Sequence, residues 1–379
     1  MNIAVNARFL LKGKLEGIGY FTQEVFNILA RQYPEHRFYF LFDRPYNKDF
    51  IVSNNIHPLV VPFPTRHPIL WKYWYDIKLP LILRKIKADV FVSTDGFCSL
   101  NSKVPQCLVV HDLGFLHQPA AYKKSHLWFY RFFTPKFLRK AKTLATVSEF
   151  SKTDIVDSYH IKPEKIRVVY SAAKEIFRPL PFEEQWAIKE KHAGGKEYFL
   201  YAGAIQPRKN IINLLKAFSV FKKRQKSEMK LILVGRIAWK NTAILQSLKT
   251  YKYRQDVILT GYLEETELVK LMSACYAFIY PSVFEGFGVP VIEAMKCQTP
   301  VLTSANSSMQ EIAEDAALYF NPADYQDIAD KLMLIYKDEN KRAQLVEKGK
   351  PVADRYSWDR TANLLWQSIL DAVPDKTNR

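Results

Sequence analysis

Residues Pro281–Ser304 read P-S-V-F-E-G-F-G-V-P-V-I-E-A-M-K-C-Q-T-P-V-L-T-S, and this stretch places two glutamates, Glu285 and Glu293, eight residues apart. Between them Gly286–Gly288 predicts a turn, and Pro290 suits the first position of a helix because a missing N–H costs nothing there. Backbone N–H groups at a helix start have no partner inside the helix and attract anions. The flanking carboxylates suggest hydroxyl groups around that anion. We therefore expect a nucleotide, a sugar phosphate or a nucleotide sugar as the ligand.

Short apolar strands alternate with helical segments along the whole chain, which favours parallel sheets covered on both faces. The strands expected in the first half are Ile3–Ala7, Phe38–Phe42, Leu59–Phe63, Val90–Ser93, Leu108–His111, Leu144–Val147 and Val168–Tyr170. Those expected in the second half are Tyr198–Gly203, Leu231–Gly235, Val257–Gly261, Ala277–Tyr280, Val301–Thr303 and Leu318–Phe320. This pattern predicts an α/β protein with two doubly wound, Rossmann-like parallel-sheet domains that face each other across a cleft.

The length of 379 residues is long for one hydrophobic core and comfortable for two domains. The join is expected near Lys174–Lys196, which contains two prolines and two glycines. We expect an N-terminal domain over residues 1–178, a C-terminal domain over residues 179–357, and a last helix with a tail over residues 358–379 that packs back on the N-terminal domain. Ligands of such sheets bind at the carboxyl ends of the strands.

The net charge of +17 is unevenly distributed, because residues 1–180 hold 27 of the 55 Lys and Arg but only 14 of the 38 Asp and Glu. A one-sided positive field implies an anionic partner, for which nucleic acid, anionic lipid and a phosphorylated acceptor are the candidates. No nucleic-acid-binding motif accompanies the charge, so we expect no nucleic acid partner. Basic and aromatic residues interleaved in 69–87 and 126–142 suit a membrane interface, although some of these aromatics must belong to the core.

Several other classes of protein are not supported by the sequence. It has no D-x-D triplet, no His/Asp/Glu set at metal spacing, no G-x-x-x-x-G-K-[ST] loop and no G-x-S-x-G elbow. The scattered cysteines read as reduced core residues; they are Cys98, Cys107, Cys275 and Cys297. We see no secretory signal and no apolar run of the ~18–20 residues that span a bilayer, and therefore expect a cytoplasmic protein.

Glycines and charged residues at the ends of the first-half strands are further candidates for a site. Gly17 and Gly19 follow the first strand in an expected loop, which either approaches a ligand closely or is a plain turn. Arg8 ends that strand, and a solvated arginine is the favoured interpretation. His111 ends a later strand, where it either points into the cleft or belongs to a turn.

The second half offers a stronger candidate in Gly203–Asn210, which ends one strand and opens a helix with Arg208 and Lys209 adjacent to each other. Two cations at a helix N-terminus oppose the helix dipole, which makes sense if they neutralise a diphosphate. The alternative is a pair of solvent-exposed basic residues. Gly235 and Leu263 follow two other strands and either line a nucleobase pocket or belong to ordinary turns.

Taken together, these motifs resemble the retaining glycosyltransferases of family 4, which have the GT-B fold. The resemblance covers essentially the whole chain. It rests on G-I-G at 17–19, V-V-H-D-L-G-F-L at 109–116, T-V-S-E-F-S-K-T-D-I at 146–155, Y-A-G-A-I-Q-P-R-K-N at 201–210, P-S-V-F-E-G-F-G-V-P-V-I-E-A-M at 281–295 and Y-S-W-D at 356–359. The P-R-K-N variant looks like a subgroup rich in mannosyltransferases of surface-polysaccharide assembly.

The resemblance implies that the N-terminal domain binds the acceptor and the C-terminal domain binds a nucleotide-sugar donor. Lys209 with Arg208 would hold the donor diphosphate and stabilise the leaving group without a metal ion or other cofactor. Glu293 would bind the ribose hydroxyls and Glu285 the hydroxyls of the transferred sugar, while His111 would reach that sugar from the other domain. The remaining donor contacts would be Gly17, Gly19, Gly203, Gly235, Leu263, Gly286, Phe287, Gly288 and Val289.

One departure from the family pattern follows Gly203, since many members have an arginine where this chain has Ala204. Arg208 is the candidate to supply that charge. Ser148 would cap the helix that follows T-V-S-E-F.

The resemblance favours transfer of mannose from GDP-mannose, with a UDP-sugar as the alternative, and with retention of the anomeric configuration. The acceptor would be a glycan or a polyprenyl-diphosphate-linked glycan, reached at the inner face of the cell membrane.

Two other enzyme classes and one binding function remain as alternatives. A glucan synthase- or phosphorylase-like enzyme of the same fold would act on soluble polysaccharide and would not need the basic aromatic surface. A non-catalytic nucleotide-sugar-binding subunit would not need Glu285, Glu293, Lys209 and His111 together. A dinucleotide oxidoreductase would need a full G-x-G-x-x-G at the first strand–helix turn, which the chain lacks.

Overall fold

The structure is a computed structural model that describes residues 1–374 except 14, 64, 66, 237–245, 247 and 249. The chain divides into two compact units, Met1–Ser171 with Ser357–Arg379, and Ala172–Tyr356. The division precedes the expected boundary at residue 178 because Lys174 and Glu175 pair with Glu265 and Lys296 of the second unit.

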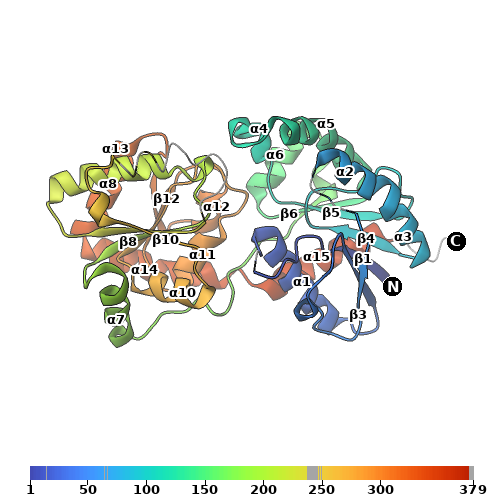
Figure 1. Ribbon diagram of the computed structural model, residues 1–379, viewed down its shortest axis with the longest axis horizontal. Coiled ribbons are helices and arrows are strands. Elements are labelled where there is room, and N and C mark those ends of the chain that lie inside the picture. Colours follow the sequence, from blue (N-terminus) through green and yellow to red (C-terminus); the bar gives the residue numbers. More distant parts are fainter. Residues whose placement is uncertain are drawn as a thin grey trace. The chain divides into compact units, whose positions relative to one another are not determined.

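The first unit contains a seven-stranded parallel sheet in the order β3-β2-β1-β4-β5-β6-β7. Its strands are β1 Asn2–Asn6, β2 Arg37–Phe42, β3 Ile56–Val60, β4 Val90–Ser93, β5 Gln106–Val110, β6 Thr143–Thr146 and β7 Ile166–Val168. Its helices are α1 Gly17–Gln32, α2 Pro68–Tyr73, α3 Leu79–Lys85, α4 Gly114–His117, α5 Lys124–Lys140, α6 Glu149–Tyr159 and α15 Trp358–Ala372, with a π-helical turn at Trp74–Lys78. Helices α5 and α6 cover one face of the sheet, and α1 and α15 cover the other (Figure 1).

The second unit contains a six-stranded parallel sheet in the order β10-β9-β8-β11-β12-β13. Its strands are β8 Tyr198–Ala202, β9 Lys230–Val234, β10 Val257–Gly261, β11 Ala277–Tyr280, β12 Val301–Ser304 and β13 Ala317–Phe320. Its described helices are α7 Phe182–Ala193, α8 Ile211–Gln225, α10 Glu265–Ala274, α11 Val289–Lys296, α12 Met309–Ala313, α13 Tyr325–Lys337 and α14 Glu339–Asp354. Helices α8 and α13 lie on one face, with α7, α10 and α14 on the other (Figure 1).

The predicted fold class, an α/β protein with two Rossmann-like parallel sheets, is confirmed. Central strands such as β5 and β8 are buried along their whole length, which explains their continuous apolar sequences. The largest error concerns β3, which begins at Ile56 and not at Leu59. The strand includes Pro58, because β3 is an edge strand, where the missing N–H of a proline is tolerated.

The last helix, α15, packs on the first unit as expected. Trp366 stacks on Tyr33 with ring centroids 4.1 Å apart, and Thr143 Oγ1 donates to the carbonyl oxygen of Ser368 at 2.8 Å. Leu365 and Ile369 are fully buried. The chain therefore completes the first unit only after it has traversed the second.

In both sheets the strand order reverses next to the first strand, between β1 and β4 and between β8 and β11. Connections on the two sides of such a point run over opposite faces of the sheet, which opens a crevice at the carboxyl ends of these strands. Candidate residues that follow these four strands are therefore expected to meet.

The prediction that Gly17 and Gly19 lie in a loop is wrong, because helix α1 begins at Gly17. A Cβ atom on Gly19 would lie 2.6 Å from the carbonyl oxygen of Phe9 and 2.8 Å from Leu15 Cδ2, so this glycine permits the helix to approach the preceding loop. A Cβ atom on Gly17 would meet nothing within 4 Å.

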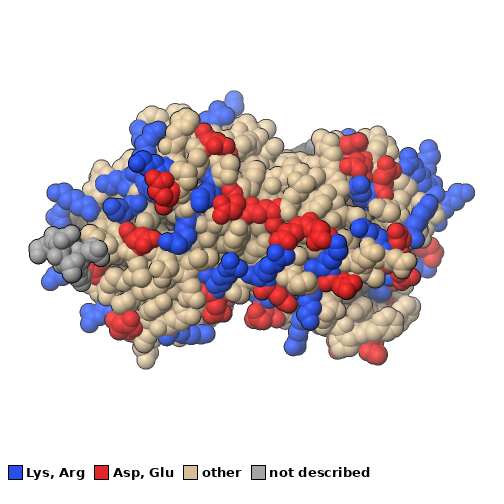
Figure 2. Space-filling model, turned by 180° about the vertical axis from the view of Figure 1, so that it is seen from behind, with Lys and Arg blue, Asp and Glu red and all other residues tan. Residues whose placement is uncertain are grey.

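Basic side chains are numerous on the surface of the first unit. Seen from behind, blue Lys and Arg side chains gather at the upper left, on the first unit (Figure 2). The described helices that contribute to it include α5, which has basic residues but no acidic ones.

We predict that Gly19→Ala lowers the free energy of unfolding by about 1–3 kcal/mol, because the new methyl group collides with backbone that cannot move freely. Urea denaturation measures the change. Gly17→Ala is the matched control: its methyl group enters open space in the same helix, so its stability should be unchanged or slightly higher. Equal stability of the two variants would contradict the packing role of Gly19.

Candidate functional site

The crevice of the second sheet is bordered by the segments that follow β8 and β11. The first segment forms a short 3-10 turn, Pro207–Lys209, and Asn210 in a left-handed conformation (φ 60°) then turns the chain into α8. The second segment runs from Pro281 to Gly288 and leads into α11. Two of the strongest sequence candidates therefore lie on neighbouring strands of one sheet.

These segments are joined through Glu285, which is buried. Lys209 Nζ donates to Glu285 Oε1 at 2.5 Å and to the hydroxyl of Tyr280 at 2.5 Å. Arg208 Nη1 lies 3.4 Å from Glu285 Oε2 and donates to the carbonyl oxygen of Phe284 at 2.8 Å. Both cations thus face the same carboxylate, and the alternative that they are solvent-exposed is wrong for Lys209, which is 7% exposed.

Serine side chains hold the loop that carries Glu285. Ser282 Oγ donates to Glu285 Oε1 at 2.5 Å, and Ser307 Oγ accepts from the backbone N–H of Glu285 at 3.1 Å. Ser308 Oγ donates to the carbonyl oxygens of Glu285 and Phe287 at 3.0 and 3.1 Å. The carboxylate is therefore fixed through its oxygens and also through its own backbone.

The charge of Glu285 follows from these contacts. Burial by itself raises the pKa of this carboxyl group, but the charges of Arg208 and Lys209 and the hydrogen bonds from Lys209 and Ser282 outweigh it and lower the pKa to about 2. Glu285 is therefore an ionised, acceptor-only group at neutral pH.

Glu293 lies in a different environment, on helix α11. Burial raises its pKa to about 8, the neighbouring charge of Glu265 adds to this effect, and Lys174 opposes it. Glu285 and Glu293 have no described contact partner in common, and they hold opposite protonation states at neutral pH. The two carboxyl groups therefore lie in different electrostatic environments.

The turn between the glutamates is tightly packed. Gly288 has φ 97°, and a Cβ atom there would lie 2.4 Å from Met309 Cε, so only glycine fits without a shift. Phe287 is buried against Tyr356 in an edge-to-face contact at 5.4 Å. Gly286 is buried, while Val289 is half-buried as the first residue of α11, whose backbone N–H groups lack partners inside the helix.

The other predicted residues of this unit follow neighbouring strands. Gly203 and Gly235 lie against each other after β8 and β9, since a Cβ atom on Gly235 would come within 1.9 Å of the carbonyl oxygen of Gly203. Leu263 is half-buried between β10 and α10. The close approach of Gly203 and Gly235 explains why a side chain would not fit at position 235. A role for Gly203, Gly235 or Leu263 in ligand binding stays a prediction.

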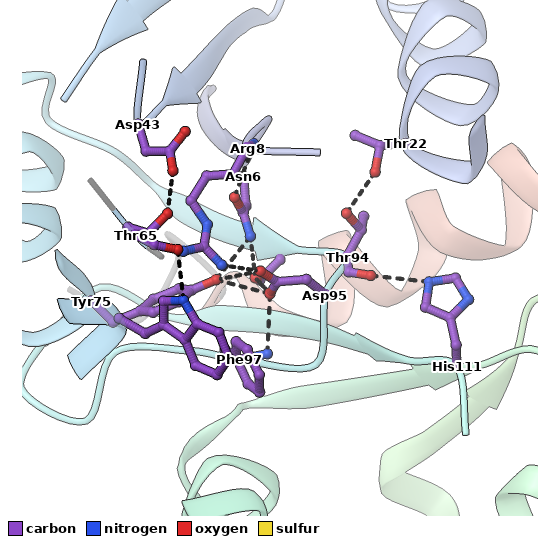
Figure 3. Close-up of polar contacts among 12 residues, drawn as sticks. Asn6, Arg8, Thr22, Asp43, Thr65, Tyr75, Thr94, Asp95, Phe97 and His111 are labelled. Carbon is purple, nitrogen blue, oxygen red and sulfur yellow. Dashed lines mark hydrogen bonds and ion pairs between the residues drawn. The ribbon is translucent and has the colours of Figure 1, made fainter. Parts of the chain in front are cut away.

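The first unit has its own ion pair at the crevice between β1 and β4 (Figure 3). Arg8 Nη2 donates to Asp95 Oδ2 at 2.6 Å, and the Arg8 guanidinium lies over the rings of Trp74 and Tyr75 at 5.1 and 4.9 Å. The Tyr75 hydroxyl donates to Asp95 at 2.8 Å. The interpretation of Arg8 as a solvated arginine is wrong, because the residue is only 6% exposed.

His111 follows β5 on the same edge of the first sheet. Its Nε2 is 3.0 Å from the carbonyl oxygen of Thr94, which can only accept, so Nε2 carries the hydrogen (Figure 3). Burial lowers the pKa of His111, although Asp112 and the Thr94 carbonyl group oppose that shift. Neutral His111 therefore offers Nδ1 as a hydrogen-bond acceptor.

A pocket of about 250 Å³ opens beside His111. Its lining combines carboxylates with aromatic rings, namely Asp95, Asp112, Phe97, Phe115, Tyr122 and Tyr130, together with Thr134 and apolar residues. Such a mixture of hydrogen-bonding groups and flat apolar faces suits a small polar ligand.

The structure thus brings Arg208, Lys209 and Glu285 together with the Gly286–Val289 turn in the second unit, whereas His111, Gly17 and Gly19 belong to the first. Ser148 caps α6 as expected, by accepting from the backbone N–H of Ser151 at 3.0 Å. The four cysteines are buried and unbridged. Within the described part of the chain, no group of three or more His, Cys, Asp or Glu could hold a metal ion.

Sequence reasoning missed several polar residues of both crevices. Ser282 and Tyr280 lie in or beside the decisive stretch, and Asp95 comes two residues after the expected strand Val90–Ser93. Position at a strand's carboxyl end was the available signal for Asp95 and Tyr280. Ser307 and Ser308 follow β12 and gave no comparable signal, because their partner is the backbone of the Glu285 loop.

Comparison with known proteins agrees with this arrangement. Residues 16–173 match the family described as Glycosyltransferase Family 4, and residues 182–352 match Glycosyl transferases group 1. O-antigen chain mannosyltransferase B of Escherichia coli is 26% identical over 362 residues, which cover 92% of this chain and 94% of the relative. O-antigen chain mannosyltransferase RfbU of Salmonella typhimurium is 30% identical over 262 residues, 68% of each chain.

Among solved structures, Anabaena HepE in complex with UDP-glucose has a TM-score of 0.77 at 16% identity and covers 98% of this chain and 99% of its own. At that identity the likeness concerns the fold, which is that of two Rossmann-like domains. The two family matches follow each other along the chain in the same division as the two structural units. The chain therefore belongs to the family 4 (group 1) glycosyltransferases.

Proposed function

We propose that this glycosyltransferase moves a mannosyl group from GDP-mannose to a glycan or lipid-linked glycan acceptor, with retention of the anomeric configuration and without a metal ion. The observation that carries the proposal is the cluster of buried Lys209 and Glu285 with half-buried Arg208, which sets two cations and one ionised carboxylate at the carboxyl ends of β8 and β11. The mannosyl donor is favoured because two relatives are named O-antigen chain mannosyltransferases.

In this proposal each charged group acts on a different part of the donor. Lys209 and Arg208 bind the diphosphate and stabilise the negative charge that grows on it as the sugar leaves; fixed cations in a buried site achieve this without reorganisation. Ionised Glu285 accepts hydrogen bonds from hydroxyls of the transferred sugar. Glu293, protonated at neutral pH, can both donate to and accept from ribose hydroxyls.

Retention follows if the acceptor attacks on the face that the diphosphate leaves. The bond between the anomeric carbon and the phosphate oxygen breaks, and a bond from that carbon to the acceptor oxygen forms. The acceptor proton passes to an oxygen of the departing diphosphate, so no protein base is required. Glu285 is unsuited to be that base because its pKa is about 2.

The first unit supplies the acceptor side of the proposal. The pocket of about 250 Å³ beside His111 is on the scale of a single sugar ring, and its carboxylates and aromatic rings suit sugar hydroxyls and C–H faces. His111 Nδ1 can accept from a sugar hydroxyl at the mouth of this pocket.

We predict that Glu285→Gln and Lys209→Met each reduce the rate of mannosyl transfer by about 10²–10³-fold, because each removes a charge from the donor site. The rate is measured as GDP release in single-turnover assays with GDP-mannose and a mannose-terminated acceptor. Lys223→Ala, an exposed lysine further along α8, is the matched control and should keep the wild-type rate. Circular dichroism verifies that each variant is folded.

A Glu285→Gln variant with the full transfer rate would contradict the assignment of this cluster. A panel of GDP-, UDP- and ADP-sugars in thermal-shift assays separates donor choice from catalysis. Stabilisation by a UDP-sugar alone would overturn GDP-mannose while leaving the site intact. Stabilisation by none of them would overturn the donor site itself.

We further propose that the first unit docks on an anionic membrane surface. Exposed apolar residues recur at every fourth position along α2, the π-helical turn and α3, and two more lie on α5, which packs against α2 through Phe129 and Trp71. We call these residues the apolar stripe. Its members are Ile69, Tyr73, Ile77, Leu81, Trp128 and Phe132, which are 39–71% exposed.

Basic residues surround the apolar stripe. Lys72 Nζ lies over the ring of Phe133 at 5.2 Å, and Lys136 Nζ over that of Phe132 at 3.6 Å. The segment Pro68–Lys87 contains one acidic residue, Asp76, which is buried, and α5 contains none. Exposed aromatic side chains next to basic ones, with no exposed acidic residue nearby, suit the boundary between anionic head groups and acyl chains. Each basic residue near that surface adds about 1 kcal/mol of attraction to the anionic lipid.

The helices that carry the apolar stripe also supply aromatic residues to the core, as expected. Trp74, Tyr75 and Phe129 are at most 2% exposed. None of the helices in the described ranges is long and apolar enough to cross a bilayer. The association that we propose is peripheral and reversible.

We predict that Trp128→Ala combined with Leu81→Ala reduces co-sedimentation with vesicles of phosphatidylglycerol and phosphatidylethanolamine by at least fivefold, because both substitutions remove apolar area that would enter the lipid. The control is Trp186→Ala, which removes an equally exposed tryptophan from α7 of the second unit. Wild-type protein that fails to bind these vesicles at low salt, or equal loss in the control, would overturn membrane docking.

A further inference from the structure

A second hollow of the first unit has no lining residue in common with the pocket beside His111. It is a groove of about 760 Å³ between the end of α5, the start of β6, the α6–β7 connection and the end of α15. Six basic side chains line it, which we call the basic groove: Arg139, Lys142, Lys152, Lys162, Lys165 and Arg167.

Two cations of the basic groove lie at the amino ends of strands, because Lys142 immediately precedes β6 and Lys165 immediately precedes β7, whereas Lys152 lies in the first turn of α6. His111 follows the carboxyl end of β5 in the same parallel sheet. The groove shares no lining residue with the proposed acceptor pocket beside His111, and the proposed transfer reaction uses none of the groove residues.

Most positive charges of the basic groove are not neutralised by the protein. Arg167 pairs with Asp371 at 2.9 Å. Lys165 Nζ caps the C-terminus of α5 by donating to the carbonyl oxygens of Leu138 and Arg139 at 2.8 and 3.1 Å. The other four cations make no ion pair with any residue in the described ranges; they are Arg139, Lys142, Lys152 and Lys162. Glu164 and Asp371 are the acidic residues that line the groove.

The cations are also close enough to oppose one another. Burial lowers the pKa of Lys165, and the charge of Lys142 lowers it further. Like charges held around one hollow raise the free energy of the empty protein, and an anion among them would remove that cost. Phosphate oxygens are the ligands that arginine and lysine bind best.

We propose that the basic groove is a second anion site, which binds a ligand carrying two or more phosphate groups. Four unpaired cations exceed what one phosphate neutralises, and a volume of about 760 Å³ is in the range of small-molecule and cofactor sites. The phosphates come either from a soluble polyphosphorylated compound or from neighbouring head groups of an anionic bilayer. This inference does not depend on the transferase proposal, because the groove and the donor site share no residue.

Isothermal titration calorimetry with inorganic tripolyphosphate at constant ionic strength tests the proposal. Wild-type protein should show two binding events, one lost in Lys209→Ala and the other weakened at least tenfold in Arg139→Gln/Lys142→Gln. Both substituted side chains are exposed, so the double variant should fold normally, which circular dichroism verifies. The charge-matched control is Arg31→Gln/Lys103→Gln, which removes two exposed cations elsewhere in the first unit and should bind as wild type does.

Two results would overturn the second site. One is a groove variant that binds tripolyphosphate as tightly as wild-type protein; the other is an equal loss in the control, which would mean that only net charge matters. Loss of the Lys209-dependent event alone would count against the donor site and leave the groove untouched.

A vesicle experiment distinguishes the two sources of phosphate. If head groups fill the groove, Arg139→Gln/Lys142→Gln should reduce binding to phosphatidylglycerol vesicles, and tripolyphosphate should release wild-type protein from them. If the ligand is soluble, vesicle binding should be the same in the groove variant and the wild type, while tripolyphosphate binding is lost.

Discussion

The buried ion pair between Lys209 and Glu285 is the interaction on which the proposed donor site depends. It connects the segments that follow β8 and β11, and it is completed by Arg208, Ser282 and Tyr280. Removing one partner of such a pair typically costs about 3–5 kcal/mol, since it leaves a buried charge without compensation. The same pair keeps Glu285 ionised and positions the loop that leads into α11. The ionisation of Glu285 therefore depends on its side-chain contacts, while Ser307 and Ser308 hold the backbone of its loop.

The first unit repeats this arrangement. Arg8 and Asp95 follow β1 and β4, as Lys209 and Glu285 follow β8 and β11, and each pair spans the point where strand order reverses. Each Rossmann-like sheet thus closes its own crevice with one cation and one carboxylate. The surroundings differ, because Arg8 lies against the rings of Trp74 and Tyr75, whereas Lys209 is accompanied by a second cation. In our account, the extra positive charge of Arg208 beside Lys209 is what allows the second unit to bind the donor diphosphate.

Most of the fold could be predicted because parallel strands buried on both faces appear in the sequence as short apolar runs. Strand β3 was misplaced since an edge position, which tolerates Pro58, is a property of the sheet and not of the local sequence. Glu285, Arg208 and Lys209 could be identified from their motifs. The burial of Arg8 could not, because its partner Asp95 lies 87 residues away and the neighbouring rings of Trp74 and Tyr75 come from a third segment. Gly19 was assigned to a loop because a glycine required by close packing within a helix resembles a glycine required by a turn.

A crystal structure of the wild-type protein with GDP tests the central claim most directly. The account predicts diphosphate oxygens within about 2.7–3.2 Å of Lys209 Nζ or the Arg208 guanidinium, with the ribose hydroxyls at Glu293. Glu285 should remain in contact with the two cations beside the position that the sugar would occupy. A diphosphate bound elsewhere, with Lys209 and Arg208 contacting only Glu285, would contradict it.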